Sequence, residues 1–352
     1  MAEKQINVGG VLIGGGAPVS VQSMTNTKTE DVEATAAQIK RLEKAGCDII
    51  RLAVPTMEAA NAIERIKEQV DIPIVADIHF DYRLAIAAAE HGADKIRINP
   101  GNIGGEDRVK AVVDVCRQRG IPIRVGVNGG SLERDILAKY GGVTPQAMMD
   151  SAMGHVRLLN RFDFDDICIS VKSSDVRLNI ESYRLLAEQT NYPLHLGVTE
   201  AGTEYMGIIK SAAGIGALLC DGIGDTIRVS LTADPEREVV AGVSLLKALG
   251  LRKSGVNIIS CPTCGRTKID LISIAAEAER RLVDCKRDIT VAIMGCAVNG
   301  PGEASRADYG IAGGDGEGVV FRKGQILKKA PMDKLVDELI ALVESPDEVK
   351  GR

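Results

Sequence analysis

Tryptophan is absent from this chain of 352 residues, and tyrosine and phenylalanine together make up only 3% of it. An excess of basic residues is also missing, because 43 lysines and arginines stand against 48 aspartates and glutamates. Surfaces that bind nucleic acid are usually basic and often carry aromatic side chains on which bases stack. We therefore do not expect nucleic acid as a partner.

Long apolar runs are lacking as well. No stretch approaches the roughly 20 apolar residues that a membrane-spanning helix needs. The opening residues, Met-Ala-Glu-Lys-Gln-Ile, contain no apolar signal core, so we expect neither membrane attachment nor export but a cytoplasmic protein. Thiols stay reduced in that compartment, and the eight cysteines therefore indicate metal or thiol chemistry rather than a disulfide framework.

From Pro18 to about Gly250, short β-rich runs alternate with longer helical patterns. Such alternation is typical of parallel βαβ units, and eight of them over about 230 residues predict a (β/α)8 TIM barrel. An open Rossmann-type sheet is the alternative, but no Gly-x-Gly-x-x-Gly follows the first strand. Residues 6–16 predict a small hairpin that plugs the barrel floor. The eight β-rich runs are Val19–Met24, Asp48–Val54, Ile74–His79, Lys95–Asn99, Ile123–Asn128, Ile167–Lys172, Leu194–Glu200 and Thr226–Leu231.

Charged side chains occupy alternate positions of these runs. In Lys95-Ile-Arg97-Ile-Asn99 the isoleucines can face the helices, so the polar residues point into the barrel. Cations that converge from several strands cannot pair with one another and need an anion, for which the fork of arginine suits phosphate oxygens. The alternation predicts these inward side chains: Arg51, Asp77, His79, Lys95, Arg97, Asn99, Arg124, Asn128, Ser170, Lys172, Arg228 and Ser230.

Two alternatives remain open at this point. The cations could neutralise Asp77, Glu200 and similar neighbours in a purely structural network. Glu200 itself is ambiguous, because alternation places it on the face opposite Thr199, where it would pair with a helix. If the pleat is lost at the end of its strand, Glu200 can instead turn to the barrel mouth as a general acid or base.

After Leu249 the rhythm of the sequence changes. A short link rich in glycine, lysine and serine separates a predicted barrel of residues 1–250 from a small α+β domain of residues 251–352. In the second domain, a predicted strand leads directly into Cys261-Pro-Thr-Cys264. Another ends just before Cys296, which could bring the thiols together at one sheet edge.

Three thiols are one ligand short of a tetrahedral site. Spacing alone allows structural zinc, but zinc prefers a fourth cysteine or histidine, and no histidine follows Cys261. Glu303 stands seven residues after Cys296 in a Gly-Pro-Gly context. Thiolates combined with one hard carboxylate suit an iron–sulfur cluster whose unique iron can release that carboxylate. Spacing discriminates poorly between zinc and a cluster.

Several long motifs give the chain a family resemblance. Nearly the whole sequence resembles 4-hydroxy-3-methylbut-2-enyl diphosphate synthases of the non-mevalonate isoprenoid pathway, in the short bacterial form. The motifs that carry the resemblance are Gln22-Ser-Met-Thr-Asn-Thr27, Ala76-Asp-Ile-His-Phe80, Ile96-Arg-Ile-Asn-Pro-Gly-Asn102, Arg124-Val-Gly-Val-Asn-Gly-Gly-Ser131, His195-Leu-Gly-Val-Thr-Glu-Ala-Gly202, Cys261-Pro-Thr-Cys-Gly-Arg266 and Met294-Gly-Cys-Ala-Val-Asn-Gly-Pro-Gly-Glu303.

The resemblance implies an oxidoreductase that opens and reductively dehydrates 2-C-methyl-D-erythritol 2,4-cyclodiphosphate with two electrons from flavodoxin or ferredoxin. It also implies a head-to-tail homodimer and Glu200 as the acid–base residue. By the matched motifs, a [4Fe–4S] cluster would be held by Cys261, Cys264, Cys296 and Glu303. The diphosphate would be bound by Arg51, Arg97, Arg124, Asn128, Lys172, Arg228 and Ser230.

Two other classes of function compete with this interpretation. One is a barrel lyase or aldolase for a phosphorylated substrate, with zinc tying the tail together. The other is an iron–sulfur carrier or sensor that uses the barrel only as a scaffold. Iron and sulfide analysis distinguishes the zinc-containing lyase or aldolase from the enzyme that the resemblance implies. Diphosphate binding distinguishes that enzyme from a carrier or sensor.

Overall fold

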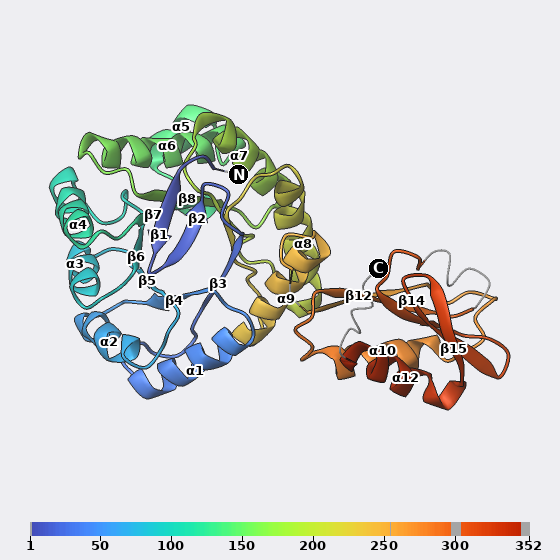
Figure 1. Cartoon of the computed structure of the whole chain (residues 1–352). Helices are drawn as coiled ribbons and strands as arrows, with labels where there is room; N and C mark the ends of the chain where they lie inside the picture. Colours follow the sequence, from blue (N-terminus) through green and yellow to red (C-terminus); the bar gives the residue numbers. More distant parts are fainter. Residues whose placement is uncertain (1, 254, 297–303, 346–352) are drawn as a thin grey trace. The chain divides into compact units, whose positions relative to one another are not determined.

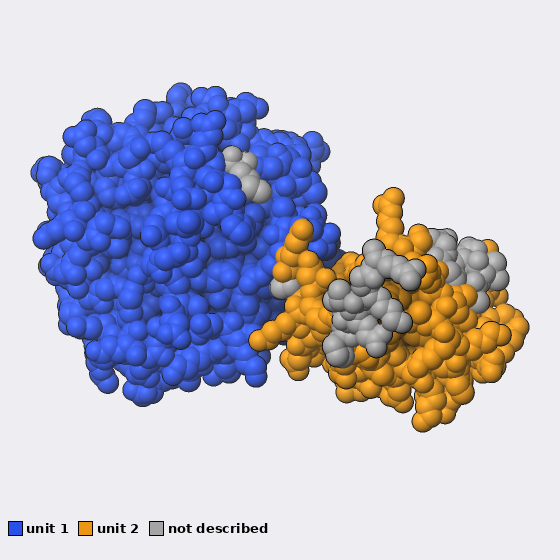
Figure 2. Space-filling model, in the orientation of Figure 1, with its two compact units in different colours: residues 1–252 blue, residues 253–352 orange. Residues whose placement is uncertain are grey.

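The computed structural model describes residues 2–253, 255–296 and 304–345. The chain forms two compact units, residues 1–252 and 253–352, which Figure 2 shows in different colours. None of the helices in the described ranges combines the length and the apolar character needed to cross a membrane.

Eight parallel strands form the wall of the first unit. Their order in the sheet is β8-β7-β6-β5-β4-β3-β10-β9, and a parallel bridge between Ile169 and Leu194 joins the two ends into a nearly closed barrel. The (β/α)8 prediction is therefore confirmed. The strands are β3 (Ser20–Met24), β4 (Ile49–Ala53), β5 (Ile74–Asp77), β6 (Lys95–Ile98), β7 (Ile123–Asn128), β8 (Ile167–Lys172), β9 (His195–Leu196) and β10 (Thr226–Ile227).

Helices surround this barrel on the outside (Figure 1). Several begin at a capping side chain that accepts a hydrogen bond from the first turn, as Asp31, Thr56 and Asp175 do. The helix α5 was not predicted, because its seven residues, which end at Tyr140, are too few for a clear period. The helices are α1 (Val32–Lys44), α2 (Met57–Lys67), α3 (Tyr82–Glu90), α4 (Glu106–Arg119), α5 (Arg134–Tyr140), α6 (Pro145–Arg161), α7 (Val176–Gln189), α8 (Glu204–Cys220) and α9 (Pro235–Ala248).

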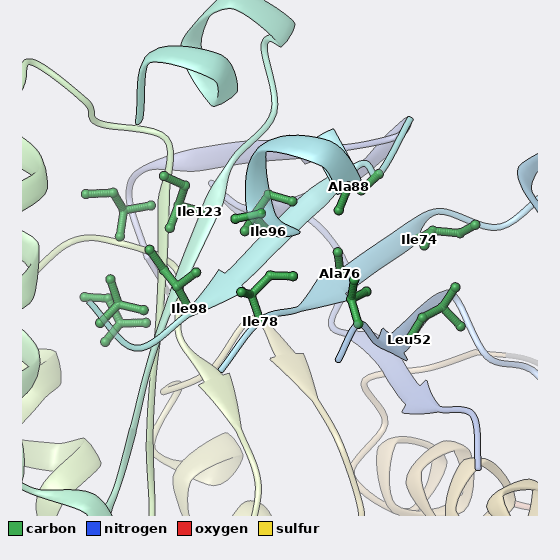
Figure 3. Packing of buried hydrophobic residues seen from close by; sticks show 14 of the residues in the cluster. Leu52, Ile74, Ala76, Ile78, Ala88, Ile96, Ile98 and Ile123 are labelled. Atoms are coloured by element: carbon green, nitrogen blue, oxygen red, sulfur yellow. The ribbon is translucent and has the colours of Figure 1, made fainter. Parts of the chain in front are cut away.

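The apolar half of each strand packs against these helices. Ile96, Ile98 and Ile123 lie with Ala88 of α3 in one large buried cluster between strands and helices (Figure 3). The alternate residues of the same strands, such as Arg97 and Arg124, therefore face the barrel interior. Hydrophobic burial on the outside of the strands thus fixes the direction of the charged side chains.

A hairpin of β1 (Gln5–Val8) and β2 (Val11–Gly14) precedes the barrel. Its side chains Ile6, Val8 and Ile13 are buried in a cluster with the inward residues Ile49, Val75 and Cys168. Figure 1 shows the hairpin lying across the ring of strands. The prediction that this hairpin plugs the barrel floor is confirmed.

The last two barrel strands are much shorter than predicted, at two residues each. Just after β10 the N–H of Arg228 still donates to the carbonyl of Leu196, whereas the N–H of Leu231 donates to Glu238 Oε1 at 2.9 Å. The chain at Thr199 and Glu200, after β9, forms a turn rather than the end of a strand.

The second unit is a mixed sheet in the order β11-β12-β13-β14-β15, with β11, β12 and β13 parallel and the last two strands antiparallel. The helices α10 and α12 pack on one of its faces. The strand β13 was not predicted. The elements are β11 (Val256–Ser260), α10 (Leu271–Leu282), β12 (Ile289–Met294), β13 (Tyr309–Ala312), β14 (Glu317–Arg322), β15 (Gln325–Pro331) and α12 (Leu335–Glu344).

Candidate active site at the barrel mouth

One cavity of about 140 Å³ gathers the polar side chains at the carboxyl ends of the barrel strands. All seven residues for which we predicted substrate contact line it. Their contact with a substrate stays a prediction, but their convergence is a property of the fold. The lining consists of Arg51, Asp77, His79, Arg97, Arg124, Asn128, Ser170, Lys172, Thr199, Arg228 and Ser230.

Two glycines make room for the longest of these side chains. A Cβ atom on Gly126 would lie 2.6 Å from Nε of Arg97, and one on Gly197 would lie 2.7 Å from Nζ of Lys172. Contacts this short are not tolerated, so any side chain at either position would displace the cation beside it. Arg97 and Lys172 can therefore occupy their positions only because Gly126 and Gly197 have no side chain.

Among the described residues that line the cavity, Asp77 is the one carboxylate. It accepts from Arg97 at 3.0 Å and lies 3.6 Å from Nε of Arg51. Burial by itself would raise the pKa of Asp77, but Arg51 and Arg97 lower it well below its ordinary value. Asp77 is therefore ionised and orients two of the arginines.

Glu238 of α9 orients Arg228 in the same way. Its Oε2 lies 3.2 Å from Nη2 of Arg228, and the carboxylate is buried. Arg51 also donates to the Met24 thioether, at 2.9 Å from Nη2 to Sδ. A thioether is a weak, neutral acceptor, so Met24 orients Arg51 without compensating its charge.

Positive charge is left over in this cavity. Of the described residues, five cations face only two carboxylates, Asp77 and Glu238. Arg124 is buried, and its pKa is lowered to about 10 by burial and then by Arg97. Burial, followed by Arg124, also holds the pKa of Lys172 well below its ordinary value. An environment that disfavours cations in the free protein is suited to an anionic ligand.

The depressed pKa of Lys172 predicts proton uptake when a cyclic diphosphate binds. Each phosphate of such a ligand carries a single, strongly acidic hydroxyl, so the ligand itself does not titrate near neutral pH. The anion raises the pKa of Lys172, and the affinity should therefore fall as the pH rises from the lowered value toward 10.5. Calorimetric titrations at several pH values below 10.5, in buffers of different ionisation enthalpy, measure the uptake. Lys172→Met should reduce it, and equal uptake in that variant would contradict the assignment.

Glu200 lies beside this cavity rather than in it. It lines an adjoining pocket of about 580 Å³, and the two share Asn128 and Thr199. The backbone of Glu200 is left-handed, with φ of 52°, which is costly for a residue other than glycine. This turn, rather than strand alternation, sets the direction of Glu200, which lines its pocket together with Leu178 of α7.

Sequence reasoning missed three contributors to this site. Thr199 lies at the junction of the two pockets, Met24 contacts Arg51, and Glu238 pairs with Arg228. Thr199 and Met24 stand inside motifs that carried the family resemblance, so a signal for them existed. Glu238 stands in an amphipathic helix, where a glutamate is ordinarily solvent-exposed, and no sequence signal distinguished it.

The cysteine motifs follow neighbouring strands of the second unit. Ser260, the last residue of β11, pairs in register with Ile293 of β12, so Cys261 and Cys296 leave the same edge of the sheet. The N–H of Gly295 donates to Sγ of Cys261 at 3.1 Å. Hydrogen bonds from Arg266, through its backbone and then its side chain, lower the pKa of Cys264. The fourth predicted ligand, Glu303, lies outside the described residues.

These thiols have the chemistry that a metal–sulfur centre requires. Cys261 and Cys296 are partly exposed and Cys264 is exposed, so all three are accessible. An N–H···S bond stabilises a thiolate and is a usual feature around iron–sulfur sulfurs. Within residues 2–253, 255–296 and 304–345, no three metal-ligating side chains already stand close enough to hold an ion. The three thiols fit an iron–sulfur cluster, because they are accessible and follow neighbouring strands at one edge of the sheet.

Fold and site together define a class: (β/α)8-barrel proteins with a cation-lined mouth, joined to a mixed α/β unit that presents cysteines at a sheet edge. Residues 3–243 match the GcpE TIM-barrel domain, and residues 257–345 match the GcpE protein C-terminal domain. The chain belongs to the GcpE family.

Relatives cover the chain almost end to end. It is 59% identical to 4-hydroxy-3-methylbut-2-en-1-yl diphosphate synthase (flavodoxin) of Clostridium perfringens, over 97% of this chain and 98% of that protein. Identity to the synthase of the same name from Caldanaerobacter subterraneus is 61%, over 97% and 96%. Among solved structures, dihydropteroate synthase from Xanthomonas albilineans has a TM-score of 0.50 at 17% identity, covering 70% of this chain and 97% of its own. That likeness shows the barrel fold alone.

Proposed function

We propose that this protein is a 4-hydroxy-3-methylbut-2-en-1-yl diphosphate synthase, the activity printed in the names of its relatives. It converts 2-C-methyl-D-erythritol 2,4-cyclodiphosphate into 4-hydroxy-3-methylbut-2-enyl diphosphate and is an oxidoreductase. One carbon–oxygen bond to phosphate breaks, a hydroxyl leaves as water and a double bond forms, with two electrons and one proton consumed. The observation that carries the proposal is the surplus of cations in a small cavity at the barrel mouth.

The cavity supplies the binding part of this reaction. Arg51, Arg97 and Arg228 are held by Asp77 and Glu238, so their remaining donors point to one place before the ligand arrives. Arg124 and Lys172 contribute charge that no carboxylate of the described residues neutralises in an ion pair. Preorganised donors in a water-poor site stabilise phosphate oxygens far more than they would in bulk water. Asn128 and Ser230 complete the lining with uncharged donors.

Glu200 supplies the proton. A hydroxyl group leaves as water only when it is protonated, and the pocket of Glu200 adjoins the cation-lined cavity through Asn128 and Thr199. A carboxyl group at this junction reaches a small ligand held by the arginines. The strained backbone at Glu200 keeps the side chain there.

A [4Fe–4S] cluster is the proposed source of electrons. Cys261, Cys264, Cys296 and Glu303 would hold it, in a domain of residues 251–352 that complements the substrate-binding domain of residues 1–250. When bound, the cluster supplies single electrons and a Lewis-acidic iron. Electrons would come from flavodoxin or ferredoxin. We further propose a cytoplasmic location and a head-to-tail homodimer.

Turnover of the cyclic diphosphate by anaerobically purified protein tests the proposed function. Reduced flavodoxin is supplied in excess, and the linear diphosphate is measured by mass spectrometry. Protein that contains zinc and no sulfide, with no turnover, would favour a barrel lyase instead. Iron and sulfide without binding of the cyclic diphosphate would favour a carrier or sensor.

Cys261→Ala should abolish the bound iron and sulfide and, with them, the visible absorption of the cluster. The physical reason is that a cluster held by three thiolates does not survive the loss of one at a sheet edge open to solvent. Iron and sulfide are measured after anaerobic purification. Cys285→Ala is the matched control, because Cys285 lies in the same unit, is also partly buried and belongs to no motif. A Cys261→Ala protein that kept its full iron content would contradict the ligand set.

A further inference from the structure

Lys95 is a fully buried cation that the proposed site does not use. It is 0% exposed, and its Nζ has no hydrogen-bond partner among the described residues. It stands two residues before Arg97 on the same strand, so both side chains face the barrel interior, with Lys95 about 7 Å nearer the floor.

The surroundings of Lys95 do not stabilise a charge. It pairs in register with Val75, which belongs with Cys168 to the apolar cluster under the hairpin. Burial is the main reason that the pKa of Lys95 falls to about 8. Cys168 opposes this shift, and Arg124 and Arg51 lower the pKa further. A cation that is desolvated beside other cations is costly to the free protein.

No carboxylate in the described part of the chain offsets this cost. Asp77 is engaged by Arg51 and Arg97 at the level above. Asp225 accepts from the backbone N–H groups of Leu194 and Ala2. A methionine would fill nearly the same volume without the penalty, so the ammonium group needs a reason beyond packing.

We propose that Lys95 is a positioning residue for the diphosphate, which acts through Arg124. Arg124 pairs in register with Arg97, so the Lys95 charge lies on the floor side of the buried Arg124 and directs its guanidinium, by repulsion, toward the mouth. This inference rests on the proposed function, because the bound diphosphate offsets the free-energy cost of burying the Lys95 ammonium group.

The test is a pair of measurements on Lys95→Met. Removal of an uncompensated buried charge should raise the melting temperature of the ligand-free protein by about 2–6 °C. The same change should weaken the binding of inorganic diphosphate roughly tenfold, which corresponds to about 1.4 kcal/mol. Replacement of a lysine with a purely structural role would lower the melting temperature. A higher melting temperature together with weaker diphosphate binding therefore identifies the proposed role of Lys95.

Thr226→Val is the matched control. The Thr226 hydroxyl is also buried in the barrel without a hydrogen-bond partner among the described residues, but it is neutral. This variant should bind diphosphate like the parent. Lys95→Gln repeats the test with a polar side chain, and failure of both Lys95 variants to fold would overturn the inference in favour of a structural role.

The outcomes separate the two proposals. If the parent protein binds diphosphate and Lys95→Met binds it equally well, the role of Lys95 is refuted and the proposed function stands. If the parent protein itself does not bind diphosphate, both the proposed site and the role of Lys95 are refuted.

Discussion

Arg124→Met should lower kcat/KM for the cyclic diphosphate by about 100- to 1000-fold, the usual cost of losing a preorganised donor in a water-poor site. Arg124 is 1% exposed, carries no ion pair within the described residues and points into the mouth cavity. In the free protein its charge opposes that of Arg97, so the substitution should not reduce stability as the loss of a paired arginine would. The variant should therefore lose activity without losing stability.

Three measurements decide this prediction. Steady-state kinetics give kcat and KM, calorimetry gives the dissociation constant for the diphosphate, and thermal unfolding gives the stability. Arg177→Met is the control, because Arg177 is almost wholly exposed on α7 and its one ion pair in the described part of the chain is with Glu181, one turn away. Unchanged kinetics for Arg124→Met would remove this arginine from the site. A large drop in melting temperature would instead assign it to a structural network.

Glu200→Gln should reduce kcat by about 100- to 10,000-fold, the range that a positioned general acid contributes. Glutamine has nearly the same shape and fits the same turn, but it cannot deliver a proton to the leaving hydroxyl. The dissociation constant for the cyclic diphosphate and the iron content should stay at the parent values, since Glu200 lies outside the cation-lined cavity.

The control for Glu200 is a carboxylate on the outside of the barrel. Glu181→Gln removes one half-exposed charge from α7 and should leave kcat unchanged. Turnover of Glu200→Gln at the parent rate would assign the proton to another group. Loss of iron in this variant would show that Glu200 acts on the metal centre, which the proposed function does not foresee.

The direction of the charged strand residues was predictable because a strand has only two faces. Ile96 and Ile98 must be buried against helices, and Lys95 and Arg97 are then forced into the barrel. The same logic located Arg124 and Arg228 from sequence. The cysteines that follow β11 and β12 were likewise expected at one sheet edge. These two strands pair in parallel, so Cys261 and Cys296 follow them at the same edge.

Prediction failed at the ends of the last two barrel strands, which are only two residues long. The strand β10 ends at Ile227, and the N–H of Leu231 donates to the side chain of Glu238 in the helix that follows. Alternation left the direction of Glu200 open, and the structure has Glu200 in a left-handed turn beside the cation-lined cavity. Neither feature follows from strand alternation, because a side-chain hydrogen bond to the backbone and a left-handed turn both depart from the regular pleat.

The sequence by itself determined the barrel, the inward direction of its cations and the family, since all three depend on local periodicity or on contiguous motifs. Only the tertiary structure decided which cations are neutralised. Asp77 lies between Arg51 and Arg97 of the two neighbouring strands. Glu238 pairs with Arg228, whereas Arg124 and Lys172 have no carboxylate partner within the described residues. The physical reason is that charge balance depends on the register of neighbouring strands and on the packing of a helix against them, which no local pattern encodes.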